Sequence, residues 1–262
     1  MNKNFCLVLG GGAARGLAHI GVISRLNELD RFPCEISGTS IGALIGAFYA
    51  AGYTAEEMKK IAIETNFLKL IDLDLKHGLL KGNKIMKYLL KYLGEVTFDD
   101  LKIPLTIVST DINTGEKIIH KEGRVIDAIR ASISIPGVFI PYKHQGRHLV
   151  DGGITENLPV NVLSNTESPV IAVSVQFDPK KQIKIKKTLL FPNGSIFSNS
   201  YGIIRKMVGI MMNQNEARSI EGRKNLLLIR PGQEEIDYYD FKKMKQMIQE
   251  GYKVSESIIN FL

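Results

Sequence analysis

A serine between two glycines, in Gly38-Thr-Ser40-Ile-Gly42, has the spacing of a nucleophile elbow. In such an elbow the serine lies on a sharp turn between a strand and a helix, and the flanking glycines, Gly38 and Gly42, remove side chains that would clash there. The positive end of the following helix would face the negative charge that develops at Ser40. An ordinary Gly/Ser turn would have the same letters, but a predicted short strand before it and an apolar helix after it favour a nucleophilic serine.

A second glycine cluster, Gly10-Gly-Gly-Ala-Ala-Arg-Gly16, follows a continuous apolar run at residues 5–9. Its spacing does not fit a dinucleotide-binding loop, because Arg15 stands where the third glycine should be, and no Walker lysine pattern exists. Consecutive backbone N–H groups ahead of a helix could instead form an oxyanion hole, with Arg15 adding positive charge nearby. A mere tight turn is the alternative.

In the usual chain order of a catalytic triad, the serine comes first, then the acid and then the histidine that acts as the base. The residues that could serve Ser40 do not follow this order. None of the five histidines follows Asp151, which argues against a triad without excluding one, since triad order varies between folds. A carboxylate within hydrogen-bond reach can accept the serine proton directly. Asp151 ends a short predicted strand and is followed by Gly152 and Gly153, so its backbone is open to close approach; an Asp-Gly turn is the alternative.

The elements that must position these residues alternate along the chain. Buried strands are predicted at 5–9, 104–110 and 170–175, a returning strand at 116–120, short strands at 35–37 and 148–150, and a last strand at 226–229. Helices are predicted at 17–29, 41–51, 125–132 and from 241 onward, and Gly52 ends the second of them. A capping box of Thr54 and Glu57 predicts a further helix that begins at 54. This alternation predicts an α/β fold with a largely parallel sheet.

Length and composition suit one large domain or at most two small ones, with a hydrophobic content of 44% that is ordinary for a soluble chain of 262 residues. The net charge of +7 favours contact with anionic surfaces and does not by itself choose between phospholipid and nucleic acid. No nucleic-acid-binding motif supports the second choice, so no nucleic-acid partner is expected.

The expected compartment is the cytoplasm. The two cysteines, Cys6 and Cys34, form no disulfide framework and no metal-ligand spacing, so reduced core thiols in a reducing compartment are expected. The apolar run at residues 5–9 is too brief for a signal peptide. The longest apolar stretch, 41–51, is far shorter than the ~20 residues that span a bilayer, so any membrane contact would be peripheral.

Together these blocks resemble the patatin-like phospholipases, in their bacterial form. The glycine cluster, the elbow and Asp151-Gly-Gly153 match that family's three signature blocks in the right order. Three further blocks are also similar: Leu17-Ala-His-Ile-Gly-Val22, Thr110-Asp-Ile-Asn-Thr-Gly115 and Ala131-Ser-Ile-Ser-Ile-Pro-Gly-Val-Phe139. The resemblance implies a three-layer α/β sandwich around a mostly parallel sheet. It covers roughly residues 5–175, the core of a single domain expected over 1–262, with a variable part at about 180–262.

Carried over by position, the resemblance assigns Ser40 as the nucleophile and Asp151 as the acid of a Ser-Asp dyad, with no metal or other cofactor. It places Gly10, Gly11, Gly12 and Ala13 in the oxyanion hole, and Arg15, Gly38, Gly42 and Gly152 in support. Ala13 stands where many relatives have another glycine, and alanine tolerates a positive φ poorly. His19 falls within a predicted helix and is expected to be structural.

The last third of the chain matches the family far less. Five lysines between 180 and 187 precede apolar residues at helical spacing, from Ile203 to Met212. The whole Lys180–Met212 region could dock on an anionic membrane or cover the substrate cleft. A solvated loop followed by a helix packed on the core is the alternative.

The sequence therefore predicts a serine acyl-ester hydrolase that acts on lipid esters, phospholipid or lysophospholipid. Two alternatives remain open: an acyltransferase with the same nucleophile, and a membrane-associated regulatory protein that keeps the fold without turnover. The acyl chain, the head group and the oligomeric state stay open.

Overall fold

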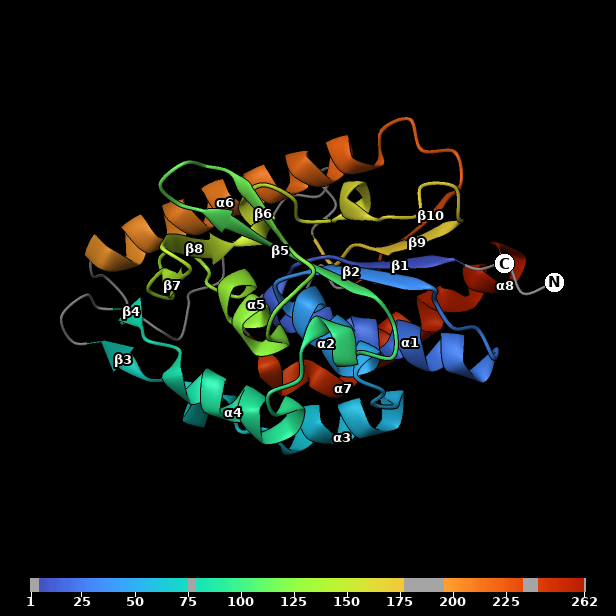
Figure 1. The fold of residues 1–262 in the computed structure, drawn as a ribbon, viewed down its shortest axis with the longest axis horizontal. Coiled ribbons are helices and arrows are strands. Elements are labelled where there is room, and N and C mark those ends of the chain that lie inside the picture. Colours follow the sequence, from blue (N-terminus) through green and yellow to red (C-terminus); the bar gives the residue numbers. More distant parts are fainter. Residues whose placement is uncertain (1–4, 75–78, 177–195, 233–239, 262) are drawn as a thin grey trace.

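The computed structural model describes residues 5–74, 79–176, 196–232 and 240–261. In it the segments predicted as strands form one mixed sheet, together with a further strand at 142–144 (Figure 1). Its strands are β1 (Cys6–Leu9), β2 (Glu35–Thr39), β5 (Leu105–Asp111), β6 (Lys117–His120), β7 (Tyr142–His144), β8 (Arg147–Asp151), β9 (Val170–Val173) and β10 (Leu226–Ile229). Their order is β10-β9-β1-β2-β5-β8-β7, and β6 also pairs with β5. A separate small hairpin consists of β3 (Leu73–Asp74) and β4 (Leu79–Leu80).

The sheet is parallel from β10 to β5 and antiparallel beyond it. β10, β9, β1, β2 and β5 run in one direction, whereas β6 and β8 pair with β5 in the opposite direction and β7 pairs with β8 in the same way. Short connections join β5 to β6 and β7 to β8, and such short turns can join only antiparallel strands. The predicted α/β class with a mostly parallel sheet is confirmed.

Helices cover both faces of the sheet, which gives three layers. They are α1 (Ala18–Glu28), α2 (Ile41–Ala50), α3 (Ala55–Glu64), α4 (Asn83–Leu93), α5 (Val125–Ser132), α6 (Ile196–Ile220), α7 (Met244–Val254) and α8 (Ile258–Phe261). In Figure 1, α1 to α5 and α7 lie on one side of the sheet and the long α6 lies on the other. Short 3-10 turns, η4 (Gly152–Ile154) and η5 (Val160–Val162), lie between α6 and the rest of the domain.

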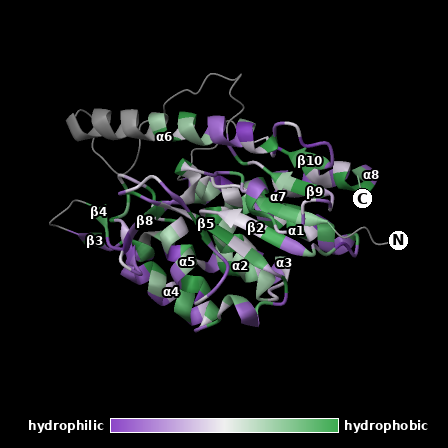
Figure 2. Ribbon diagram, turned by 45° about the horizontal axis from the view of Figure 1, so that its top comes forward, coloured by the Kyte–Doolittle hydropathy of each residue, from purple (hydrophilic) through white to green (hydrophobic). Residues whose placement is uncertain are grey.

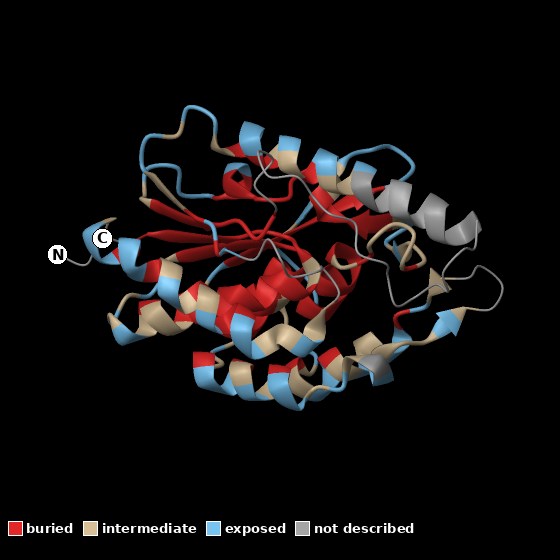
Figure 3. Ribbon diagram, turned by 180° about the vertical axis from the view of Figure 1, so that it is seen from behind, coloured by how far each residue is buried: buried red, intermediate tan, exposed pale blue. Residues whose placement is uncertain are grey.

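The core follows from strand alternation. On β1, Leu7 and Leu9 join the large cluster on the side of α1 and α2, whereas Cys6 and Val8 join a smaller cluster with η5. Because both faces are covered, β1, β2 and β9 are buried along their whole length (Figure 3), and β1 and β9 are also apolar throughout (Figure 2), as expected for parallel strands between two layers of helix.

Several elements differ from the sequence prediction. No element was predicted for α4, β7 or the β3–β4 hairpin, and α4 is an amphipathic helix with a buried face at Leu89 and Leu93. The sequence predicts one helix from Phe241 onward. The structure instead has a 3-10 turn, α7, a second 3-10 turn and α8 in that order, so the prediction of a single α-helix is wrong. At the break after α7, Ser255 Oγ donates to Gly251 O at 2.6 Å, a back-bond that commonly bends helices.

Other local predictions agree with the structure. The capping box at the start of α3 is present, with Glu57 N–H donating to Thr54 Oγ1 and Thr54 N–H donating to Glu57 Oε2. Cys6 and Cys34 are both free, and their Sγ atoms lie 3.9 Å apart. Within the described ranges, no helix combines the length and the apolar character that crossing a bilayer requires. The single-domain assignment of 1–262 stays a prediction.

The packing of α7 on α1 depends on two reciprocal glycines. A Cβ added at Gly21 of α1 would lie 2.0 Å from Ile248 O, and one added at Gly251 of α7 would lie 2.0 Å from Ala18 O. The two backbones therefore touch directly, and neither position has room for a methyl group.

We expect Gly21→Ala to lower the free energy of unfolding by roughly 1–3 kcal/mol or more, because the new methyl must push the two helices apart. Gly209→Ala is the matched control: Gly209 is also helical, on α6, and nothing lies within 4 Å of its added Cβ, so a gain of up to about 1 kcal/mol is expected. Urea unfolding of both variants measures this. Equal effects at the two positions would contradict the backbone contact.

Candidate active site

Ser40 lies at the turn between β2 and α2 in a strained backbone conformation, with φ 56° and ψ −123°. Non-glycine residues seldom adopt such a conformation, and it persists only where the surroundings enforce it. Here the Ser40 N–H donates to Ser132 Oγ at 2.7 Å, and Ser132 Oγ in turn donates to Val108 O at 2.6 Å. The side chain of Ser40 is 4% exposed, and it stands at the N-terminus of α2, as the elbow pattern predicts.

The two glycines of the elbow permit close backbone contacts. A Cβ at Gly42 would lie 2.0 Å from Leu9 O, and a Cβ at Gly38 would lie 2.6 Å from Gly42 O. The first turn of α2 therefore packs directly against the end of β1. This contact brings the glycine loop, which begins at Gly10, next to the elbow.

Asp151 reaches the same place from the antiparallel part of the sheet. β8 ends at Asp151, which pairs with Ser109 of β5, and the turn that follows approaches β5 so closely that a Cβ at Gly152 would lie 2.2 Å from Val108 O. Asp151 Oδ2 accepts a hydrogen bond from Ser40 Oγ at 2.6 Å. Asp151 Oδ1 accepts one from Gly153 N–H at 2.8 Å, which orients the carboxyl group.

The electrostatic environment makes Asp151 a stronger base than an exposed aspartate. Its complete burial raises its pKa to about 6, since the charged form loses its hydration, while the hydrogen bonds from Ser40 and Gly153 act in the opposite direction. A carboxyl group with this pKa is ionised at neutral pH and can accept the proton of the serine hydroxyl directly.

The glycine loop faces this pair, with two of its amides already engaged. Gly10 N–H donates to Val173 O at 3.0 Å and Gly11 N–H donates to Asn157 O at 3.1 Å. The amides of Gly12 and Ala13 make no backbone hydrogen bond within the described part of the chain. Ala13 has φ 48°, the left-handed conformation that the family's usual glycine would adopt more readily.

The other candidate residues of the first 20 positions have structural contacts. Arg15 is 1% exposed and follows the loop in η1 (Ala13–Leu17), where its N–H donates to Gly12 O. His19 is fully buried and its Nε2 lies 2.8 Å from Gly10 O. Burial lowers the pKa of His19 to about 4, so the ring is neutral at physiological pH and Nε2–H donates to that carbonyl.

The remaining described histidines do not reach the dyad. His120 Nε2 bonds Ser109 Oγ at 2.7 Å, and burial lowers its pKa to about 4. His144 stacks on Tyr142, and His148 contacts Asn113. Among the described residues, no hydrogen bond of Ser40 or Asp151 involves a histidine, so the geometry brings a serine and a carboxylate together.

Four polar residues near the site were not identified from the sequence: Ser132, Asn157, Gln176 and Glu216. Ser132 falls within a block that resembles the family, but nothing in the letters marks it as the acceptor for Ser40 N–H. Asn157 follows Asp151 by six positions and its side chain contacts Gly11 O. Gln176 and Glu216 lie in segments where a polar residue carries no signal of its own.

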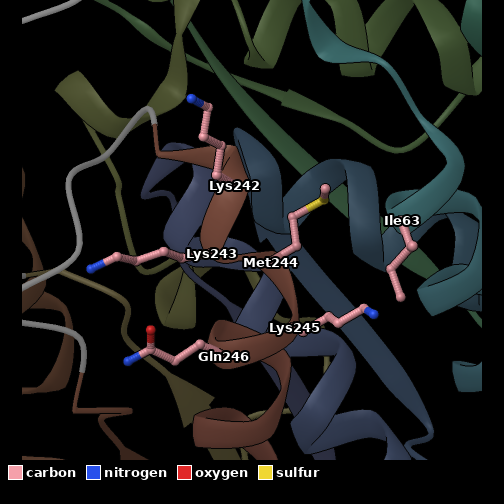
Figure 4. A pocket seen from close by; sticks show the side chains of 6 residues that line it. All are labelled: Ile63, Lys242, Lys243, Met244, Lys245 and Gln246. Atoms are coloured by element: carbon pink, nitrogen blue, oxygen red, sulfur yellow. The ribbon is translucent and has the colours of Figure 1, made fainter.

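No group of three or more His, Cys, Asp or Glu side chains suited to a metal ion exists among the residues that the structure describes. A hollow of about 350 Å³ lies between α3 and the start of α7, and the residues that line it are Ile63, Lys242, Lys243, Met244, Lys245 and Gln246 (Figure 4). None of the predicted site residues lines this hollow. The basic cluster predicted at 180–187 lies outside the described residues.

Comparison with known proteins shows the family of the chain. The family model described as patatin-like phospholipase matches residues 7–164. An uncharacterized NTE family protein of Mycobacterium tuberculosis is 39% identical over 173 residues, which are 64% of this chain and 48% of that protein. The lysophospholipase NTE1 of Saccharomyces cerevisiae is 30% identical over 264 residues, 94% of this chain and 16% of that protein.

Two solved structures have the same fold. VipD from Legionella pneumophila superposes with a TM-score of 0.65 at 15% identity, covering 99% of this chain and 67% of VipD. The type III effector protein ExoU has a TM-score of 0.51 at 12% identity, covering 100% of this chain and 53% of the ExoU chain. At such low identity these matches show the fold alone.

The structure thus combines a three-layer α/β sandwich with an elbow serine that is hydrogen-bonded to a buried aspartate beside a glycine loop. The chain belongs to the patatin-like phospholipase family. It spans about half the length of the mycobacterial relatives it matches.

Ser40 reactivity should depend on the protonation of Asp151. Because the pKa of Asp151 is raised to about 6, its carboxyl group is neutral below that pH and cannot accept a proton there. We expect the rate of Ser40 labelling by a fluorophosphonate to fall about tenfold per pH unit below the pKa and to level off above it.

Rapid-quench labelling followed by mass spectrometry measures this profile. Asp151→Asn is the control and should label slowly, with no dependence on pH in that range. A flat profile for the unmodified protein between about pH 4.5 and pH 8 would contradict the role of Asp151.

Proposed function

We propose that this protein is a serine acyl-ester hydrolase that acts on lipid esters through a dyad of Ser40 and Asp151. The observation that carries the proposal is the 2.6 Å hydrogen bond from Ser40 Oγ to Asp151 Oδ2. The bond is buried, and it lies at a strained strand-to-helix turn where the hydroxyl group is held in one position. A serine that merely stabilised a turn would need neither the strain nor a carboxylate with a raised pKa.

In the proposed reaction, Ser40 Oγ attacks the ester carbonyl while its proton moves to Asp151 Oδ2. The carbonyl oxygen becomes an oxyanion, which the amides of Gly12 and Ala13 and the N-terminus of α2 stabilise. The C–O bond then breaks, the leaving alcohol takes the proton from Asp151, and an acyl-enzyme forms on Ser40. Asp151 then deprotonates a water molecule, which attacks the carbonyl carbon of this ester. The bond between Ser40 Oγ and the acyl group breaks, Ser40 Oγ takes the proton from Asp151, and the fatty acid leaves. Gly10 and Gly11 would shape the loop, since their amides bond within the protein.

The relatives favour a lipid ester as the substrate. The family is described as patatin-like phospholipase, and the yeast relative is named a lysophospholipase. A phospholipid or lysophospholipid is therefore the substrate class that we propose, with no cofactor taking part.

Ser40→Ala should lower the rate of p-nitrophenyl ester and lysophospholipid hydrolysis by about 10³-fold or more, and Asp151→Asn by about 10²-fold or more. The matched control is Ser255→Ala, which removes another fully buried serine hydroxyl, at the end of α7 and away from the dyad; its rate should stay within about twofold.

The products distinguish the remaining alternatives. Hydrolysis gives free fatty acid, whereas an acyltransferase would give mainly the acylated acceptor when an alcohol such as glycerol is added. If the unmodified protein neither hydrolyses these esters nor reacts with the fluorophosphonate, the hydrolase proposal is wrong and a binding role becomes the better interpretation.

We also propose that the Lys180–Met212 region contacts anionic membrane. The support comes from the described part of α6, where Met207, Ile210 and Met211 are 57%, 58% and 43% exposed. Their spacing of three and four residues places them on one face of the helix. Large apolar side chains on a helix next to basic residues are typical of interfacial segments.

We expect the double substitution Ile210→Ser/Met211→Ser to weaken binding to vesicles of phosphatidylcholine and phosphatidylglycerol by about tenfold or more, since two apolar side chains no longer enter the lipid. Gln214→Ser, at an exposed polar position of the same helix, is the control and should bind like the unmodified protein. Co-sedimentation measures both. Equal binding of all three proteins would contradict this contact.

A further inference from the structure

A buried polar cluster between α6 and the glycine loop has no part in the mechanism described above. It consists of Asn157, Ser174, Gln176 and Glu216, whose exposures are 0%, 0%, 7% and 1%. These residues come from the loop between η4 and η5, from the end of β9 and from α6. Buried polar groups are unfavourable unless they form hydrogen bonds, and a carboxyl group more so than an amide. The contacts of this cluster are therefore informative about what it holds in place.

Asn157 joins α6 to the glycine loop through the donor end of its side chain. Its Nδ2 donates to Glu216 Oε1 at 2.7 Å and to Gly11 O at 3.3 Å, and Glu216 Oε2 accepts a further bond from Ser174 Oγ at 2.6 Å. Both partners of Nδ2 are acceptors, so the amide cannot turn round without losing both bonds. Its Oδ1 finds no partner within the described residues, which is consistent with an orientation set by Nδ2.

The same residue holds Gly11 at both of its backbone groups. Gly11 N–H donates to Asn157 O at 3.1 Å, and Gly11 O accepts from Asn157 Nδ2 and from Gln176 Nε2, the latter at 2.9 Å. A trans peptide is planar, so the Gly11 carbonyl and the Gly12 N–H point in opposite directions. Bonds that hold the carbonyl therefore also set the direction of the Gly12 N–H. Without them, glycines on both sides would let this peptide rotate.

We propose that Asn157, anchored by Glu216 of α6, is a positioning residue that orients the Gly11–Gly12 peptide so that the Gly12 N–H faces the oxyanion. This inference rests on the proposed function, because it presumes that the Gly12 amide stabilises the transition state. It adds that α6 takes part in forming the site through a buried carboxylate. A methyl group at Gly11 would lie 2.6 Å from Asn157 Oδ1 and 3.2 Å from Ser40 Cβ, so the held peptide adjoins the nucleophile.

Two substitutions separate positioning from simple stabilisation. In Asn157→Asp, two acceptor oxygens face Gly11 O and Glu216, so the carbonyl loses its donor at position 157 and keeps only Gln176 Nε2, while two carboxyl groups adjoin. If the two carboxyl groups share a proton, that proton lies between them. It therefore cannot replace the lost amide donor to Gly11 O. Adding Glu216→Gln supplies an amide donor for the new carboxyl group at position 157 and relieves the repulsion, but it still leaves Gly11 O without a donor from that position.

We expect Asn157→Asp to lower kcat for a p-nitrophenyl ester by about 10²-fold, the usual effect of a lost oxyanion donor, with KM within about twofold. The thermal midpoint should fall as well. In Asn157→Asp/Glu216→Gln the midpoint should recover while kcat stays low. Ser219→Ala is the matched control: it removes another buried bond between α6 and the same loop, from Ser219 Oγ to Glu156 Oε1, and should keep kcat within about twofold.

A double variant that recovers kcat together with the thermal midpoint would overturn the positioning role, as would an Asn157→Asp protein with unchanged kcat. Hydrogen–deuterium exchange of the peptide that covers residues 10–13 gives a readout that needs no activity. Exchange there should be faster in both Asn157→Asp proteins and unchanged in Ser219→Ala. If the unmodified protein fails to hydrolyse esters, the proposed function fails, whereas this exchange still decides whether Asn157 holds the loop; unchanged exchange would refute it.

Discussion

The hydrogen bond between Ser40 and Asp151 is the interaction on which the arrangement of the site depends. It joins the end of a parallel strand, β2, to the end of an antiparallel strand, β8, and both groups are almost entirely removed from solvent. Burial strengthens the bond and at the same time raises the pKa of the carboxyl group. β8 runs antiparallel to β5 and ends at Asp151, which lies opposite Ser109 of β5. The antiparallel arm of the sheet therefore positions the carboxyl group beside the elbow.

Close backbone contact is the second constraint. The elbow can approach β1 only because Gly42 lacks a side chain, and Ser40 keeps its strained dihedrals because Ser132 accepts its N–H. The strain is small compared with the packing of α2 against the sheet. A rigid core thus supports a locally unfavourable conformation, which holds the hydroxyl group of Ser40 in front of Asp151.

α6 connects the surface of the molecule to the glycine loop. Its outer face exposes Met207 and Ile210, while its inner face carries Met212, Glu216 and Ser219, which are buried. The inner residues form hydrogen bonds with the segment after Asp151 and with β9. The last third of the chain, which resembles the family least, consequently supplies contacts to its most family-like loop.

The sequence by itself determined the chemistry-bearing blocks and most of the central strands. Gly38 to Gly42, Asp151 and the glycine cluster are local patterns, and the apolar runs that became β1 and β9 are buried on both faces, so their letters suffice. The α/β class followed from their alternation. Even the capping box at Thr54 could be identified, because its two hydrogen bonds join residues only three positions apart.

Only the tertiary structure decided which groups meet. Asn157 reaches Gly11 across 146 positions and Glu216 across 59, and nothing in a linear pattern reports such pairs. The sequence likewise does not show which loop amides remain available to bind an oxyanion. Gly10, Gly11 and Gly12 are the same type of residue and differ only in whether, and with which carbonyl, the backbone N–H forms a hydrogen bond. Hydrogen bonds between distant segments depend on the packing of layers, and packing is a property of the folded chain as a whole.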